Sequence, residues 1–520
     1  MRRALNPTPA TQDFSDPVPI PAPVGGWNTR DGLGNMPITD AINLDNWYPE
    51  ATDVRPRAGS QTYAQGISDQ VETIFSYASG SNLKLFIAAG NILQNISTIG
   101  VQGTVAAATV MAGTTAFQNS RFQYVNTGTP GGNFLVAVNG ADQRQIYNGT
   151  IWFAGSTYSA STIQPFSNVE LFNQRIFYLE KNTLRVIYHH QVNAIGGTVG
   201  VAMDLSSQFR NGGKNLCIGT WTRDGGAGMD DFLVVASDQG ELAVYHGTDP
   251  SSSSTWAKVG IYRIAPPLSE RCMEKMGGEL VIATRAGIST MSSILAGLVQ
   301  QTPYTDKIRT SVNDAVSLYG DHWGWQLKYV PLFNWLLLNV PVAEGNFQQQ
   351  FVMNSQTMAW CRYLGLYANV WEIHNKLLFF GGDGVVVEQN TSFLDDDGDN
   401  IFVDGRQAAS NFGTARQKYF NMFRPLINAD GEMGLTADIN VDFANVIPTN
   451  VPDITPQQVA EWDVATWDDY YWADEATPQL FWQSCGRLGT YGSVRMRGTI
   501  NSITARWYGT AVVFQSGGVL

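Results

Sequence analysis

The sequence of 520 residues is poor in charge and contains no long apolar run. Only 15% of its residues are Asp, Glu, Lys or Arg, against roughly 25% in an ordinary soluble domain. The 45 acidic residues outnumber the 32 basic ones, which gives a formal net charge of −13. Because affinity for nucleic acid comes largely from Lys and Arg, this composition argues against a repressor or a polymerase. It argues equally against a disordered chain and against a coiled coil.

Cysteine is also scarce, and the four cysteines include no C-x-x-C pair. This wide spacing excludes a zinc ribbon and a dense disulfide framework, and it predicts buried free thiols in a reducing cytoplasm. The four are Cys217, Cys272, Cys361 and Cys485. No apolar stretch follows Met1-Arg2-Arg3, so we expect no signal peptide. The most lipophilic run, 335–340, is far too short to span a bilayer.

The motifs of common enzyme and cofactor sites are missing as well. The sequence has no G-x-x-x-x-G-K-[ST] phosphate loop and no G-x-S-x-G nucleophile elbow. His189 and His190 are adjacent, but neighbours on a strand point to opposite faces, so they cannot share a metal without a bulge. The acidic run that starts at Asp395 fails as an EF-hand loop, because Asn400 and Arg406 stand where Gly and Glu are required. A β-turn explains the run, with adventitious cation binding as the alternative. We therefore predict no enzymatic activity, no catalytic or metal-binding residues and no cofactor.

What the sequence does contain points to a mainly β fold. Fifty-two glycines and 12% aromatic residues favour many short strands joined by turns. Between residues 72 and 390, pairs of apolar runs separated by Gly, Asn or Asp recur about every 40–50 residues, which is the spacing of β-propeller blades. A pair of β-sandwiches or a β-helix would give a similar spacing. We expect a β-propeller-like domain over 72–390.

The flanking regions differ from this repeat. Residues 1–24 are rich in proline and are predicted to form an extended arm, either free or docked on a neighbouring subunit. Residues 25–71 are expected to pack on the β domains or on a neighbour. After Asn390 the alternation of polar and apolar residues indicates a second, antiparallel β domain over 391–520.

Two acidic clusters stand out near the C-terminal end of the sequence. One lies in the turn at 395–399, and the other, at 461–475, alternates with Trp and Tyr. The aromatic residues of the second cluster are interpreted as packing anchors, with a sugar-binding face as the alternative. The acids are candidates for a channel lumen or for the tip of an assembly: Asp395, Asp396, Asp397, Asp399, Asp463, Asp468, Asp469, Asp474 and Glu475.

One opening segment carries a resemblance to a known family. It reads Gly25-Gly26-Trp27-Asn28-Thr29-Arg30-Asp31, then Asp45-Asn46-Trp47-Tyr48-Pro49, then Val54-Arg55-Pro56-Arg57-Ala58-Gly59. The segment resembles the start of the tail nozzle proteins of short-tailed bacteriophages, also known as tail hub, tail tubular or packaged-DNA-stabilising proteins. The likeness continues through Val244-Tyr245-His246-Gly247-Thr248-Asp249-Pro250 and 462–468 to the end of the chain. The residues of the motif are Gly25, Gly26, Trp27, Asp45, Asn46, Trp47 and Pro49.

The resemblance implies a structural protein of the virion tail, assembled in the host cytoplasm. About six copies would form a ring below the portal and its adaptor, in contact with tail fibre, spike or needle proteins and, at ejection, with the host envelope. Such a ring is a conduit and gate for double-stranded DNA, which passes without sequence-specific binding. An acidic lumen would suit this role because it repels phosphates.

Two other functions remain open from the sequence. One is a tail-associated protein that binds or depolymerises polysaccharide, which needs convergent carboxylates in a groove or a trimeric β-helix. The other is a cellular β-propeller binding module. A ring with a pore would support the nozzle, a trimeric rod the polysaccharide-binding protein, and a monomer the binding module.

Overall fold

The structure is a computed structural model that describes residues 16–97, 106–111, 116–155, 164–197, 199–224, 229–297, 303–431, 433–449 and 482–517. The described chain is almost entirely β, which confirms the predicted fold class. Its helices are short: α1 (Met291–Leu295), α2 (Arg309–Tyr319) and the 3-10 turns Leu205–Ser207 and Asp306–Ile308. Among the described residues, no helix is long and apolar enough to cross a membrane.

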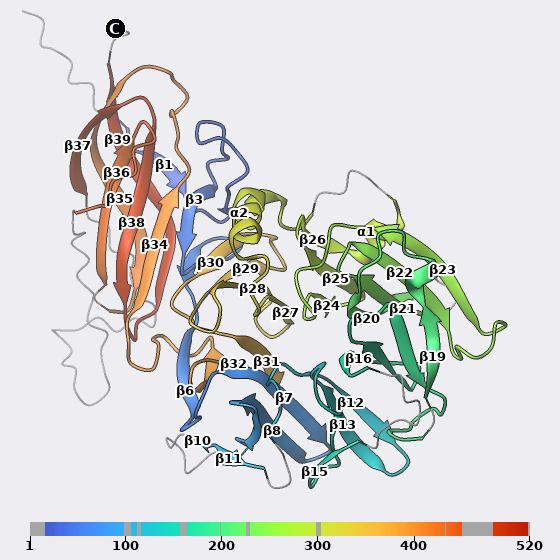
Figure 1. Ribbon diagram of the computed structural model, residues 1–520. Helices are drawn as coiled ribbons and strands as arrows, with labels where there is room; N and C mark the ends of the chain where they lie inside the picture. Colours follow the sequence, from blue (N-terminus) through green and yellow to red (C-terminus); the bar gives the residue numbers. More distant parts are fainter. Residues whose placement is uncertain are drawn as a thin grey trace, which may run out of the picture.

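Seven sheets of antiparallel strands surround a common axis (Figure 1). The first sheet consists of β7 (Val71–Ser79), β8 (Asn82–Ala89), β9 (Ile92–Asn95) and β11 (Thr109–Val110). The second consists of β12 (Gln123–Thr129), β13 (Gly132–Val138), β14 (Gln145–Tyr147) and β15 (Trp152–Ala154). The third consists of β16 (Phe166–Phe172), β17 (Arg175–Glu180), β18 (Arg185–His189) and β19 (Val199–Asp204). The fourth sheet consists of β20 (Asn215–Asp224), β21 (Met229–Ser237), β22 (Glu241–Gly247) and β23 (Trp256–Arg263). The fifth consists of β24 (Met273–Met276), β25 (Glu279–Thr284) and β26 (Gly287–Thr290). The sixth sheet contains β27 (Gln326–Val330), β28 (Trp335–Ala343), β29 (Phe347–Asn354) and β30 (Trp360–Tyr363). The seventh contains β31 (Val370–His374), β32 (Leu377–Gly381) and β33 (Val386–Asn390).

The first strand of each sheet lies innermost, and these seven strands close a ring. Strands β7, β12, β16, β20, β24, β27 and β31 each contact the next, and β31 contacts β7. The described chain therefore contains a seven-bladed β-propeller, which confirms the predicted architecture. The seventh blade is completed by β6 (Gly59–Gln65), which pairs antiparallel with β33 and parallel with β10 (Ala106–Ala107). A strand from before the first blade thus fastens the last one.

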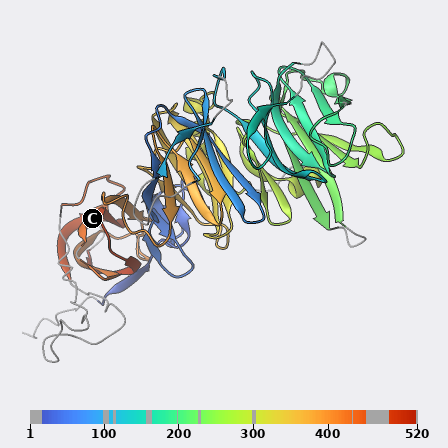
Figure 2. The same cartoon turned by 90° about the horizontal axis from the view of Figure 1, so that it is seen from below.

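The second domain is a β-sandwich at the side of the propeller, and Figure 2 shows the same placement from below. One sheet has the order β37 (Gln483–Gly489), β35 (Lys418–Ala429), β39 (Ala505–Ser516), β5 (Val54–Pro56) and β4 (Trp47–Pro49), with β1 (Val18–Pro21) also on β39. The other contains β34 (Ile401–Gln407), β38 (Gly492–Ile500) and β36 (Gly434–Val441). Apolar side chains of both sheets belong to one buried cluster. Three of these sandwich strands, β1, β4 and β5, therefore come from residues 18–56 and the rest from residues after 400.

The two domains share a continuous sheet. Strand β3 (Asp40–Asp45) pairs antiparallel with β34 of the sandwich and, at Asp45 and Arg362, parallel with β30 of the sixth blade. The short β2 (Gly26–Trp27) pairs parallel with β3. Because backbone hydrogen bonds run from the blade through β3 into the sandwich, the N-terminal strands fix one domain to the other.

Candidate functional site: the propeller channel and the interdomain joint

The axis of the propeller contains a cavity of about 300 Å³. Residues of all seven inner strands line it. Polar and charged side chains predominate, among them Glu170, Glu270, Arg271, Glu274, Lys328 and Glu372. The channel is thus a charged passage of small cross-section.

The charges of the channel compensate one another across blades. Lys328 Nζ lies 2.9 Å from Glu372 Oε1, and although burial lowers the pKa of Lys328, the carboxylates of Glu372 and Glu274 raise it overall. Arg271 donates to the backbone oxygens of Glu72 and Phe122 at 3.0 and 2.9 Å. Burial lowers the pKa of Arg271 to about 10. These contacts tie the fifth blade to the first and second.

Glu170 differs from the other acids of the channel. It forms no ion pair with a described residue, and burial raises its pKa to about 7, although Lys275 opposes the shift. At neutral pH this carboxyl therefore exists in both protonation states. Its charge therefore responds to small changes in pH.

A second cavity, of about 460 Å³, forms the mouth of the channel. It shares Gln123 and Glu270 with the channel and lies among the loops where the inner strands begin. Arg121 crosses it, with Nε 2.9 Å from Glu72 and its guanidinium 4.5 Å above the Trp323 ring. The remaining lining is rich in amides, which suits a small polar ligand.

The channel is too small for duplex DNA. A double helix, whose major groove alone is about 12 Å wide, does not fit a cavity of about 300 Å³. The ion pair between Lys328 and Glu372 also lies in the passage. A DNA duplex therefore cannot pass along the axis of this propeller.

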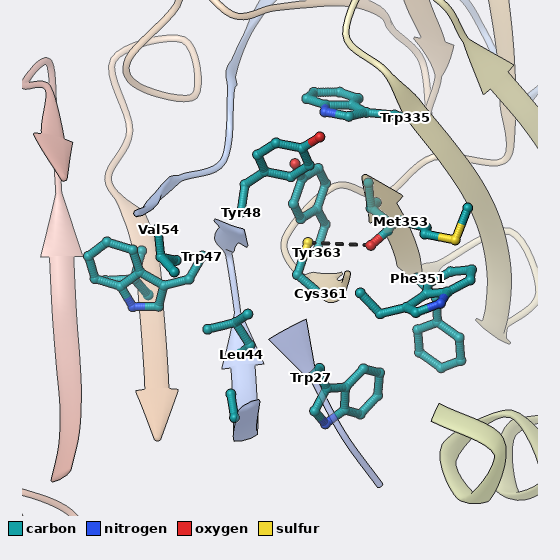
Figure 3. Packing of buried hydrophobic residues seen from close by; sticks show 14 of the residues in the cluster. Trp27, Leu44, Trp47, Tyr48, Val54, Trp335, Phe351, Met353, Cys361 and Tyr363 are labelled. Carbon is teal, nitrogen blue, oxygen red and sulfur yellow. Dashed lines mark hydrogen bonds between the residues drawn. The ribbon is translucent and has the colours of Figure 1, made fainter. Parts of the chain in front are cut away.

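The N-terminal motif lies at the joint between the two domains, and Figure 3 shows two of its residues, Trp27 and Trp47, among the buried side chains there. Gly26 has φ +81°, and a Cβ there would lie 2.6 Å from the backbone N and O of Trp360. Trp27 packs edge-on against Phe351 at 5.4 Å. A Cβ on Gly25 would lie 2.1 Å from Asp40 Oδ1. Both glycines are thus required by close packing of the joint.

The second half of the motif forms the polar and aromatic centre of the joint. Asp45 accepts two hydrogen bonds from Arg362, at 2.7 and 2.8 Å. Asn46, at φ +56°, donates to the carbonyl oxygens of Leu364 and Phe402, and so links the sixth blade to β34. Trp47 packs against Trp507, with their ring centroids 5.8 Å apart. The carbonyl oxygen of Pro49 accepts a hydrogen bond from Asn354 Nδ2 at 3.1 Å.

The acidic turn at 395–399 is anchored next to the strand that closes the propeller. Asp396 forms a bidentate ion pair with the buried Arg57 and accepts a hydrogen bond from Ser60 Oγ at 2.9 Å. The hydroxyl of Ser502 and a backbone amide in the turn lower the pKa of Asp395. Two further acids of this turn, Asp397 and Asp399, are exposed. The charge of Asp396 is therefore compensated, and only part of the cluster presents charge to solvent.

The remaining candidate acids, Asp463, Asp468, Asp469, Asp474 and Glu475, lie outside the described residues. Within the described ranges, no group of three or more His, Cys, Asp or Glu side chains is placed to hold a metal ion. The four cysteines are free, and three of them are buried. The charged residues of the channel were not found from the sequence. They could have been found only after the first strand of each blade was known, as polar positions alternating with apolar ones.

Comparisons with known proteins return fold similarity alone. No family model and no curated protein matches the chain. The solved structure of BBS1N in complex with ARL6DN is 11% identical, with a TM-score of 0.38, over 65% of this chain and 98% of the other. YCF48 from Cyanidioschyzon merolae is 9% identical, with a TM-score of 0.38, over 64% of this chain and 99% of the other. The structure of U3-55K is 10% identical, with a TM-score of 0.36, over 62% of this chain and 96% of the other. Similarity at this level transfers no ligand and no function to this chain.

Proposed function

We propose that this chain is a structural subunit of the tail of a short-tailed bacteriophage. Copies of it would form the ring-shaped nozzle below the portal and its adaptor, a conduit and gate for genome retention and ejection. The observation that carries the proposal is the position of the motif residues that resemble this family. They are separated in the sequence, yet they converge at one joint between the propeller and the sandwich. The motif residues thus form one three-dimensional unit of this chain.

The size of the propeller channel supports a ring of several copies. Because duplex DNA does not fit along the axis of one propeller, the conduit of the proposed nozzle lies between subunits. The exposed acids Asp397 and Asp399 suit the wall of such a bore, since acids there repel phosphates, whereas each Lys or Arg would add a contact that slows passage. In this role duplex DNA passes the chain without sequence-specific binding, and the chain has no enzymatic activity.

Electron microscopy of the purified full-length protein tests the proposal. We expect closed rings of about six copies with a central pore wide enough for a duplex. Gel filtration at several protein concentrations provides the control for dissociation on dilution. Monomers at every concentration, or trimeric rods, would refute the nozzle. A monomer would favour a binding module, and a rod would favour a polysaccharide-binding tail protein.

The mouth of the channel favours a second candidate function, the binding of polysaccharide. Its lining includes the amide side chains of Asn91, Gln118, Asn119, Gln123 and Asn139, which suit a ligand with many hydroxyl groups. Calorimetric titration with host surface polysaccharide tests it, with Gln123→Ala as the variant. Release of shortened chains during the titration would add depolymerisation, and the absence of heat would exclude both.

A further inference from the structure

A third cavity, of about 690 Å³, lies between the third and fourth blades, which are neighbours in the ring (Figure 1). One wall is the turn between β16 and β17, with Asn173 and Gln174, and the other is the loop between β22 and β23. That loop contains Thr248 and Asp249 of the sequence motif 244–250, to which the proposed tail function gives no role. The volume is within the range of about 300–1,000 Å³ that is common for sites of small ligands.

This cavity and the mouth of the channel open on opposite faces of the propeller. The mouth lies where the inner strands begin, and it includes Lys181 from the turn between β17 and β18. Asn173 and Gln174 instead follow the end of the inner strand β16, so their turn lies on the other face. Because successive strands of a blade run antiparallel, the loop between β22 and β23 lies on that same face. The cavity is therefore a site of its own.

An ion pair fixes the chemistry of the cavity. Arg175, which is only 8% exposed, places Nη2 3.1 Å from Asp249 Oδ2 and donates from Nη1 to the carbonyl oxygens of His189 and His190. Ser251 donates to Asp249 Oδ1 from its amide at 3.0 Å and from its hydroxyl at 2.7 Å. These two bonds from Ser251 also lower the pKa of Asp249, so the carboxylate is charged at neutral pH. Its side chain remains 34% exposed, and it is thus an oriented acceptor on the cavity wall.

The walls around this pair are held in place before any ligand binds. Asn173 Nδ2 donates to the carbonyl oxygen of Gly247 at 2.8 Å, which joins the turn of the third blade to the loop of the fourth. The amide of Thr248 donates to the carbonyl oxygen of Thr255 at 3.0 Å. A Cβ on Gly247 would collide with that same oxygen, so the loop is closed tightly at its base. A preorganised site loses little conformational freedom on binding, which favours ligands that make only polar contacts.

The balance of charge at the cavity selects the class of ligand. A cation would be attracted by Asp249 and repelled by Arg175, and an anion would meet the opposite, so a charged ligand gains little. The remaining polar lining consists of side-chain hydroxyls and amides, from Asn173, Gln174, Thr248, Ser252 and Thr255. Such groups include both donors and acceptors, as do the hydroxyls of a sugar. Val192, which is 49% exposed, adds an apolar surface for the C–H face of a sugar ring.

We propose that this cavity between the third and fourth blades binds a neutral saccharide, whose hydroxyl groups donate to Asp249 and exchange hydrogen bonds with Thr248 and the amides of the β16–β17 turn. The inference is independent of the proposed tail function, because it requires neither a ring nor DNA. It also concerns a different site from the channel mouth.

An array of immobilised oligosaccharides, probed with the full-length protein, tests the proposal. The array carries neutral glycans built from hexoses and N-acetylhexosamines, and acidic glycans with uronic or sialic acid as the charged comparison. We expect binding to at least one neutral glycan, with a Kd that changes less than about twofold between about 50 and 500 mM salt, because salt screens only charged contacts. Binding to acidic glycans alone, or to no glycan, would overturn the proposal.

Variants assign the binding to this cavity. Asp249→Ala should raise the Kd for the bound glycan about tenfold or more, since hydrogen bonds to a charged group are stronger than neutral ones. Thr248→Val removes one exposed hydroxyl and should raise the Kd about threefold; it decides alone if Asp249→Ala fails to fold. Asp314→Asn, an exposed acid of α2, and Gln123→Ala in the channel mouth should keep the wild-type Kd. Unchanged affinity in the cavity variants, or loss of binding in Gln123→Ala, would refute the assignment.

Discussion

Replacing Asn46 with alanine should destabilise the joint between the propeller and the sandwich more than any exposed substitution. The side chain is buried, 2% exposed. It donates to the oxygens of Leu364 and Phe402 and accepts from Leu364 N and Arg57 Nε. At about 1 kcal/mol for each of the four hydrogen bonds, their loss costs about 4 kcal/mol. The φ of +56° adds about 1 kcal/mol for alanine, which gives about 5 kcal/mol in all.

Two further variants separate these contributions. Asn46→Gly removes the hydrogen bonds but tolerates the left-handed backbone, so it should cost about 1 kcal/mol less than alanine. Asn375→Ala is the matched control: it is an exposed turn residue with φ +47° and no side-chain hydrogen bond, so it should cost only about 1 kcal/mol.

The assay is guanidinium unfolding followed by tryptophan fluorescence and circular dichroism, with the slope of the transition checked for each variant. We expect Asn46→Ala to lower the midpoint far more than Asn375→Ala. A destabilisation of less than about 2 kcal/mol for Asn46→Ala, which is close to the cost of a single buried hydrogen bond, would refute the view that this residue holds the joint together.

Three other changes have expected outcomes. Glu170→Gln should flatten the pH dependence of stability, because burial raises the pKa of Glu170 to about 7. The contribution of Glu170 to the free energy of unfolding is complete below about pH 4.5 and is lost as the pH rises through 7. Equal slopes of the thermal midpoint against pH for the wild-type and variant chains would contradict this. Gly26→Ala should lower the yield of folded protein, because a Cβ at this position would lie 2.6 Å from backbone atoms of Trp360. Gly32→Ala is the control and should leave the yield unchanged, because no atom lies within 4 Å of a Cβ there. The amount of soluble protein, measured for both variants, is the readout. Asp397→Lys with Asp399→Lys should slow genome release from assembled virions in vitro if these acids line the bore, and an unchanged release rate would exclude that position.

The local turns of the propeller were predictable from the sequence because their signal is contained in a few residues. Asn148 and Gly149 begin the loop of residues 148–151 between β14 and β15, which pair antiparallel, and Gly149 adopts a positive φ of +91°, which glycine accepts without strain. The same reasoning located most of the hairpins between residues 72 and 390. It needed no information about distant parts of the chain.

The closing strand and the joint were not predictable in the same way. Gly59 in β6 pairs with Asn390 in β33, and no short-range pattern indicates a partner more than 300 residues away. The sequence motif at Asp45 and Asn46 indicated a family resemblance but not a position, because the partners of these residues are backbone atoms and an arginine brought near by the fold. The segment 461–475 was singled out by its composition and lies outside the described residues.

The strand pairing of the sandwich also sets an order of events during synthesis. Residues 18–21 of β1 emerge early from the ribosome, but their partner residues 509–512 in β39 are made nearly 500 residues later. At about 5–20 residues per second, the early strand waits on the order of 25–100 s for its partner. A chain cut short by incomplete translation therefore lacks the strand that secures its beginning. Only chains that reach β39 can complete this sandwich, so the fold itself discriminates against truncated chains.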